Sequence, residues 1–418
     1  MSTLPEAKIE ALRLLPGAKL LIDAVADEQG VYLVGGAVRD LMLGFAQFDF
    51  DLTYEGDATQ LAERLADRLG GTFKSHQRFG TATVRSADDV LIVDIAGTRS
   101  ETYERPGALP TVEPADLGTD LRRRDFTVNA LAVALWADRF GDLIEFDGAS
   151  ADLAARMLRV THEDSFIDDP TRLLRLLRYG ARLGFTAEPH TEDLARAAVE
   201  GGAPSTVSGP RIADELMDLL AERSAVVAVD SMYALGLDSA LHPDFHADEY
   251  VASRALLRLA DGLRQDLLLL AVCSREMDEV TVEGWIDHLG LEQPDRSVVR
   301  EAVLRHPEAI ERLEGASSPS EIDSALRPFA PETIALAAAL PSTPAVSRDA
   351  ALDWLDTRRD DHLLIGGADL RTAGVPEGPE IGRALAETMA RAIDGELTAR
   401  DSQLEYAVTV AKSLHAER

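Results

Sequence analysis

The stretch Leu33-Val-Gly-Gly-Ala-Val-Arg-Asp40, followed closely by Phe48-Asp-Phe-Asp-Leu52, decides the fold of this 418-residue chain. An apolar run leads into two glycines, and a helical pattern over Ala37 to Leu43 follows them. Because Gly35 and Gly36 lack side chains, backbone N–H groups at the start of that helix can closely approach a phosphate. The pattern therefore predicts a strand, turn and helix that bind a nucleotide.

The second stretch carries two carboxylates. Asp49 and Asp51 stand two residues apart in a predicted strand, so both side chains point to one face. Such a pair can share hard divalent cations, and two cations about 4 Å apart would clamp the attacking and leaving oxygens of a phosphoryl displacement. A solvated strand face gives the same tripeptide, but the glycine turn with Arg39 and Asp40 favours catalysis. We predict Asp49 and Asp51 as catalytic residues and Mg²⁺ ligands.

Short β-type runs and helical segments alternate up to about residue 146. We expect strands over Val31 to Val34, Phe48 to Thr53, Thr81 to Arg85 and Val90 to Ile95, and a helix over Ala58 to Leu69. The proline-rich residues 97–119 are expected to form a long irregular connection. Beyond about residue 150 only helical periodicity continues. The predicted fold class is an α+β N-terminal domain, a small mixed sheet with helices, followed by an all-α array.

Composition restricts the partners. The formal net charge of −31 argues, taken alone, against a nucleic-acid partner. Arginines are nevertheless clustered: Arg122 to Arg124 are consecutive, and four more from Arg172 to Arg182 recur at helical spacing. We therefore expect a basic stripe on an acidic body. One cysteine, Cys273, excludes an intrachain disulfide, and no apolar run approaches a membrane span, so we expect a cytoplasmic protein without membrane partners.

Residues 33–53 resemble the first motif of the class II tRNA nucleotidyltransferase and bacterial poly(A) polymerase family, within the DNA polymerase beta-like nucleotidyltransferase superfamily. Further motifs of that family follow in its order. They are Arg123-Arg-Asp-Phe-Thr-Val-Asn-Ala130, Phe146-Asp-Gly through Arg159, Asp168-Asp-Pro-Thr-Arg172, Ser208-Gly-Pro-Arg-Ile-Ala-Asp-Glu-Leu216 and the tail-like residues 364–379. The resemblance implies a catalytic head at 1–146, a base-selecting neck at 147–225, a helical body at 226–325 and a tRNA-binding tail at 326–418.

The resemblance also implies an activity. This is template-independent addition of CMP, CMP and AMP to the 3′ end of tRNA from CTP and ATP, by two-metal transfer with pyrophosphate release. Enzymes that add only A or only CC, and poly(A) polymerase, stay open, although the long 97–119 segment disfavours CC addition alone. A non-catalytic RNA-binding protein and a transferase acting on small molecules or proteins are alternatives that the carboxylate pair and the helical tail disfavour. Neither DNA nor an obligate protein partner is expected.

The fourth motif suggests how bases are chosen without a template. Cytosine and adenine both present an amino donor beside a ring-nitrogen acceptor, whereas uracil and guanine present the reverse. The Asp169 carboxylate accepts and the Arg172 guanidinium donates, so the pair fits both permitted bases. An ion pair on a helix surface shows the same spacing. In the context of the family we predict Asp169 and Arg172 as the base-selecting pair.

Other site residues are carried over from the family. Asp94 lies in a predicted strand and is either a third catalytic carboxylate or a cap of the next turn. Arg175 and Arg178 either neutralise the triphosphate or primer end or face solvent. The remaining predicted nucleotide contacts are Gly35, Gly36, Arg39, Arg124, Asp125 and Asn129.

Overall fold

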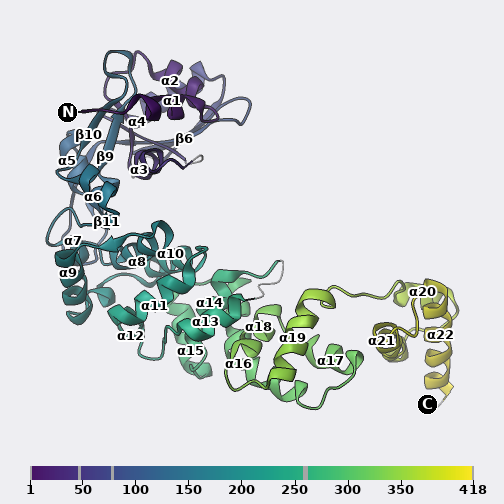
Figure 1. Ribbon diagram of the computed structural model, residues 1–418. Coiled ribbons are helices and arrows are strands. Elements are labelled where there is room, and N and C mark those ends of the chain that lie inside the picture. The colour runs from purple at the N-terminus through teal and green to yellow at the C-terminus, as the bar shows by residue number, and fades with distance from the viewer. Residues whose placement is uncertain (1, 46–48, 77–79, 258–261, 417–418) are drawn as a thin grey trace. The chain divides into compact units, whose positions relative to one another are not determined.

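The computed structural model describes residues 2–45, 49–76, 80–257 and 262–416 (Figure 1). The chain divides into two compact units, Met1–Ser208 and Gly209–Arg418. This division lies inside the predicted neck at 147–225, and the four-part division of the chain stays a prediction. Every predicted catalytic and nucleotide-binding residue belongs to the first unit.

An eight-stranded mixed sheet forms the centre of the first unit, with the strand order β1-β10-β9-β2-β3-β6-β5-β4. Only the β3 and β6 pair is parallel. Strands β2 and β9 are buried at every residue, as expected for the middle of a sheet covered on both faces. The strands are β1 (Ser2–Thr3), β2 (Val31–Val34), β3 (Phe50–Tyr54), β4 (Thr72–His76), β5 (Thr81–Arg85), β6 (Ile92–Gly97), β9 (Leu131–Ala134) and β10 (Asp142–Glu145).

Helices complete the first unit around this sheet. Helix α4 begins where the Asp57 carboxylate accepts hydrogen bonds from the backbone N–H groups of Thr59 and Gln60, and it packs its apolar side on β4 and β5. The helices are α1 (Glu6–Leu14), α2 (Ala18–Val25), α3 (Gly36–Leu43), α4 (Ala58–Arg68), α5 (Leu117–Arg122), α6 (Ala149–Ala155), α7 (Ser165–Asp168), α8 (Thr171–Leu183) and α9 (Pro189–Glu200), with short turns η2 (Thr127–Asn129), η3 (Ala137–Arg139) and η4 (Ala203–Thr206).

The second unit is helical throughout its described residues. Its helices are α10 (Gly209–Leu220), α11 (Ala225–Leu235), α12 (Leu237–Leu241), α13 (Glu249–Leu256), α14 (Gln265–Ser274), α15 (Glu279–Leu289), α16 (Asp295–Leu313), α17 (Pro319–Leu326), α18 (Pro331–Ala339), α19 (Ala345–Thr357), α20 (Gly367–Thr372), α21 (Pro379–Ile393) and α22 (Arg400–Ala416). Helix α14 is buried from Asp266 to Ser274 and carries Cys273, whose thiol pKa is raised by burial to about 12. Among the described residues no helix is long and apolar enough to span a membrane.

The predicted fold class is confirmed, with two local corrections. Residues 97–119 are not irregular, because β7 (Arg99–Thr102) and β8 (Thr111–Pro114) form an antiparallel hairpin outside the main sheet and α5 follows it. Prolines in this stretch hid the β-forming residues beside them. Beyond residue 150, β11 (Met157–Leu158) and β12 (Thr186–Ala187) form one short parallel pair. Phe48, at the start of one predicted strand, lies outside the described residues.

Candidate active site

The glycine turn lies between β2 and α3, as the sequence predicts. Gly35 has φ +64°, in the region that favours glycine, and its N–H donates to the carbonyl of Leu131 on β9 at 3.0 Å. A Cβ atom at Gly35 would lie 2.7 Å from Nη1 of Arg124, whereas one at Gly36 would lie 3.5 Å from Nη2 of Arg39. The turn therefore favours glycine at position 35 because of its positive φ, and the end of the Arg124 side chain packs directly over it.

Three carboxylates gather on neighbouring strands. In β3, Phe50 and Leu52 are buried and Asp51 between them is exposed, and Asp49, directly before the strand, is exposed as well. Asp51 pairs in register with Asp94 of β6, so their side chains leave the same face of the sheet. Asp94 accepts a hydrogen bond from the Thr83 hydroxyl and lies within its strand, so it does not cap a turn.

The carboxylates influence one another. The pKa of Asp51 is raised to about 6, first because neighbouring protein partly desolvates its carboxylate, and then because of the negative charges of Asp94 and Asp49. The Arg124 guanidinium opposes this rise. The structure therefore brings together the three predicted catalytic carboxylates and the predicted triphosphate-binding Arg124 within electrostatic range.

These oxygens suit a divalent cation. Carboxylate oxygens are the ligands that Mg²⁺ prefers, and a cation would relieve the repulsion that raises the Asp51 pKa. Within the part of the chain that the structure describes, no three His, Cys, Asp or Glu side chains form a ready-made metal-binding group. The assignment of Mg²⁺ to Asp49 and Asp51 therefore stays a prediction, supported by their chemistry and placement.

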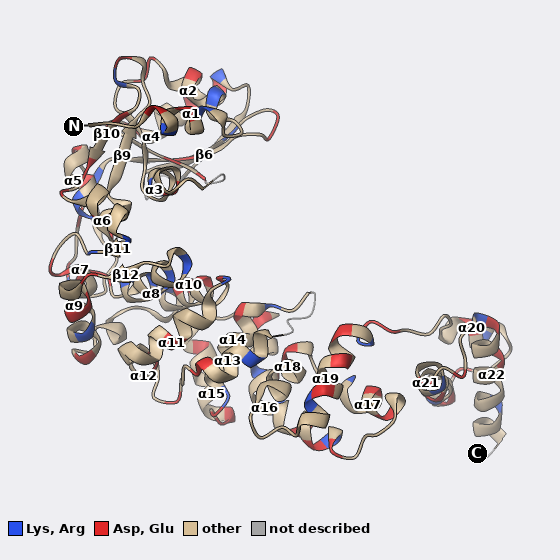
Figure 2. Ribbon diagram, in the orientation of Figure 1, with Lys and Arg blue, Asp and Glu red and all other residues tan. Residues whose placement is uncertain are grey.

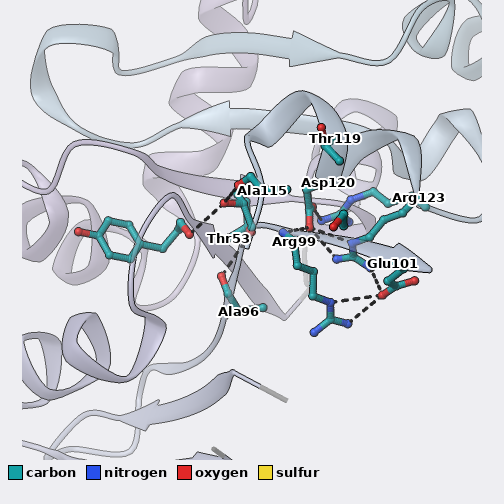
Figure 3. A network of polar contacts seen from close by, with 12 residues as sticks. Thr53, Ala96, Arg99, Glu101, Ala115, Thr119, Asp120 and Arg123 are labelled. Carbon is teal, nitrogen blue, oxygen red and sulfur yellow. Dashed lines mark hydrogen bonds and ion pairs between the residues drawn. The ribbon is translucent and has the colours of Figure 1, made fainter. Parts of the chain in front are cut away.

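Asp120 of α5 organises the arginines of the second motif (Figure 3). Its buried carboxylate accepts hydrogen bonds from Nη2 of Arg123 at 2.7 Å, from Nη2 of Arg124 at 3.0 Å and from the backbone N–H of Arg99 at 3.3 Å. Burial alone would raise the Asp120 pKa, but the two guanidinium groups lower it below its usual value. Sequence reasoning missed Asp120, although its spacing of three and four residues from two arginines was a visible signal.

A buried polar chain links α3, η2 and α8. Arg39, only 3 % exposed, donates to the carboxylate of Asp40 at 2.7 Å and to Oδ1 of Asn129 at 2.6 Å. The Asn129 amide donates to Asp125 at 3.0 Å, and Arg175 donates to Asp125 at 2.7 Å. The observed contacts of Arg39, Asp125, Asn129 and Arg175 join these elements, and their roles in binding nucleotide stay predictions.

The predicted base-selecting residues lie at the start of α8. Asp169 accepts from the backbone N–H of Thr171 at 3.2 Å and from its hydroxyl at 2.7 Å. Arg172 is buried, and its guanidinium donates to Ser165 and to the carbonyl of Arg123. Helix α8 is rich in arginine along its length (Figure 2). One turn beyond Arg175, the side chain of Arg178 is half-buried.

Comparisons with known proteins agree with this geometry. Residues 31–159 match the family described as the Poly A polymerase head domain. The chain is 36 % identical over 403 residues to an A-adding tRNA nucleotidyltransferase of Geobacter sulfurreducens, covering 92 % of this chain and 46 % of the relative. It is 27 % identical to a CCA-adding enzyme of Levilactobacillus brevis, covering 90 % and 93 %. The chain spans about half or less of the length of the first curated relatives it matches.

Solved structures extend the likeness over nearly the whole chain. A CCA-adding enzyme in its apo form II has a TM-score of 0.79 at 27 % identity and covers 97 % of this chain and 96 % of its own. The Thermotoga maritima CCA-adding enzyme complexed with tRNA has a TM-score of 0.76 at 27 % identity, covering 99 % and 100 %.

The sheet, the glycine turn and the paired carboxylates thus define a head domain of the poly(A) polymerase type. Residues 31–159 match that head-domain family, and over nearly its whole length the chain is similar to tRNA nucleotidyltransferases that add CCA or A.

Proposed function

We propose that this protein is a cytoplasmic enzyme that extends the 3′ end of tRNA by transferring nucleotides from CTP and ATP without a template. The observation that carries the proposal is the register of β3 and β6, which sets Asp51 beside Asp94 at the glycine turn. Solved relatives described as complexes with tRNA, with CTP and with ATP support the same substrates.

Each of the predicted site residues would have a distinct role in this reaction. Asp49 and Asp51 would hold Mg²⁺, with Asp94 as a third carboxylate beside them, and the bound cation would supply activation of the 3′-hydroxyl and neutralisation of the leaving pyrophosphate. Arg124 places a positive charge over the glycine turn, on the side where the triphosphate would meet the first N–H groups of α3. The Asp169 carboxylate would accept from the amino group of the base, and the Arg172 guanidinium would donate to its ring nitrogen. Cytosine and adenine both present this pair of groups.

Two products of the reaction are candidates. Sequence motifs favour complete CCA addition, with CMP, CMP and AMP added in turn. A-only addition is the second candidate, because A-adding relatives are 35 % to 43 % identical to this chain, whereas CC-adding relatives are 34 % and 40 % and CCA-adding relatives 27 % and 32 % identical. The hairpin within 97–119 is compatible with both.

Three tRNA transcripts separate these candidates. Transcripts ending before CCA, after C and after CC are incubated with enzyme, Mg²⁺ and CTP, ATP or both. Completion of all three and then a stop supports CCA addition, and extension of the CC-ending transcript alone supports A addition. Unlimited A addition indicates a poly(A) polymerase. No extension of any transcript contradicts the proposal and favours a non-catalytic RNA-binding protein.

A further inference from the structure

The guanidinium of Arg172 is held on one side by three acceptors from three segments. Nη1 donates to the hydroxyl of Ser165 at 2.6 Å and lies 3.3 Å from Nε2 of His162. Nη2 donates to the carbonyl of Arg123 at 2.7 Å. An arginine has five N–H donors, so these contacts leave Nε–H and one Nη2–H without a hydrogen bond to the described residues. Two of the five donors therefore remain available to an incoming base.

His162 contacts Arg172 as a neutral acceptor. Because Nε2 faces a guanidinium that can only donate, the ring proton belongs on Nδ1, which lies 3.9 Å from Oδ2 of Asp168. Burial and then the positive charge of Arg172 lower the pKa of His162, while the carboxylates of Asp168 and Asp164 oppose this effect. His162 is thus uncharged at neutral pH, and a protonated ring would both lose the contact and repel Arg172.

The hydroxyl of Ser165 is the other side-chain acceptor for Arg172, and its position is fixed by burial. It is fully buried at the first residue of α7, and Arg172 itself is only 5 % exposed. A base-reading group discriminates only when its donors are fixed in direction, because a mobile guanidinium can adjust to the wrong base as well as to the right one. The acceptors that fix one side of the Arg172 guanidinium therefore determine how strictly the donors on its other side select the base.

We propose that His162 and Ser165 are positioning residues that orient Arg172 and thereby set how strictly the site prefers adenine over guanine. This inference rests on the proposed function, because it takes Arg172 as the base-selecting residue. It assigns roles to His162 and Ser165, which act on the base through Arg172 rather than by contacting it.

The test compares wild-type full-length protein with His162→Leu, His162→Gln and Ser165→Ala. Leucine removes the acceptor, whereas glutamine can place its amide oxygen near the position of Nε2. His190→Leu is the matched control, because His190 is exposed and contacts Glu163 rather than Arg172. The dissociation constants of ATP and GTP with Mg²⁺ are measured first, followed by kcat/KM for each nucleotide on the CC-ending tRNA.

We expect His162→Leu and Ser165→Ala to reduce the ATP-to-GTP preference roughly tenfold, with His162→Gln and His190→Leu near wild type. As the pH falls well below 6.5, the ordinary imidazole pKa, the wild-type preference should fall while that of His162→Gln stays constant. An unchanged preference in His162→Leu overturns the inference, as does an equal loss in His162→Gln and His162→Leu. A wild-type protein that binds ATP over GTP but extends no tRNA overturns the proposed function alone, since the binding preference still tests the positioning role.

Discussion

Asp125 keeps its charge in a buried place because its partners outweigh the cost of burial. It is 7 % exposed, and burial alone would raise its pKa, yet Arg175 and the Asn129 amide lower that pKa to about 2. Its folded pKa is therefore below the unfolded value of 3.8. The stabilisation is complete above pH 3.8 and is lost as the pH falls through about 2.

We expect Asp125→Asn to lower the free energy of unfolding by about 2 kcal/mol at pH 7, because the charged pair with Arg175 is lost. The difference from wild type should shrink as the pH falls below 4. Urea unfolding between pH 3 and pH 7 measures both values. Asp89→Asn, at an exposed pair with Arg85, should change little at any pH. A deficit that stays constant with pH would contradict the charge explanation.

Gly35 and Gly36 are adjacent but should differ in tolerance. Alanine at 35 meets both a positive φ and Arg124, so Gly35→Ala should cost roughly 2 kcal/mol and displace the guanidinium from the turn. Gly36→Ala meets only an ordinary contact with the protein, so its free energy of unfolding should stay near that of wild type. Unfolding free energies together with single-nucleotide incorporation rates test this contrast. Equal behaviour of the two variants would show that Arg124 does not need the space.

For single residues, the sequence predicts positions along a strand but not the burial of arginines. The exposed positions of Asp49 and Asp51 and the strand position of Asp94 follow from the alternation of a strand, a local property. The burial of Arg39 and Arg172 does not, because it depends on partners 90 and 49 residues away in the chain. Within the predicted basic stripe, Arg172 and Arg175 bind partners 49 and 50 residues away, whereas Arg182 is exposed.

At the scale of elements, the β7–β8 hairpin contacts the segment of the predicted base-selecting residues at Gly107. The N–H of this buried glycine lies 3.3 Å from the carbonyls of Ile167 and Asp168, and a Cβ there would lie 2.7 Å from the carbonyl oxygen of Thr206. The sequence showed the turn residues Pro106 and Gly107 but not this docking, since the contact joins segments about 60 to 100 residues apart.

Gly107→Ala should therefore destabilise the first unit more than Gly148→Ala. Both glycines have positive φ, but a Cβ at Gly148 meets nothing within 4 Å. Backbone strain of roughly 1 kcal/mol is common to both, and the excess for Gly107→Ala measures the docking of the hairpin segment on α7 and η4. Thermal unfolding and hydrogen exchange at residues 103–110 provide the comparison. Equal losses would indicate that the segment docks loosely.

At the scale of the whole molecule, a formal net charge of −31 opposes both compactness and association with RNA. Added salt screens self-repulsion, so the melting temperature should rise between 50 and 500 mM NaCl. The proposed tRNA binding should weaken over the same range, because phosphate contacts release counterions. Thermal unfolding and filter-binding titrations measure the two trends. A tRNA affinity independent of salt would contradict binding through the phosphate backbone.

Burial of Cys273 in α14 should protect its thiol from labelling reagents. Its thiol is 1 % exposed and its pKa is raised to about 12, so almost none is thiolate at neutral pH and maleimide reagents should leave it unmodified. A cysteine introduced at an exposed site in each of the two units would then accept a fluorophore without background from the native residue. Energy transfer between such a pair would measure the distance between the two units with and without nucleotide.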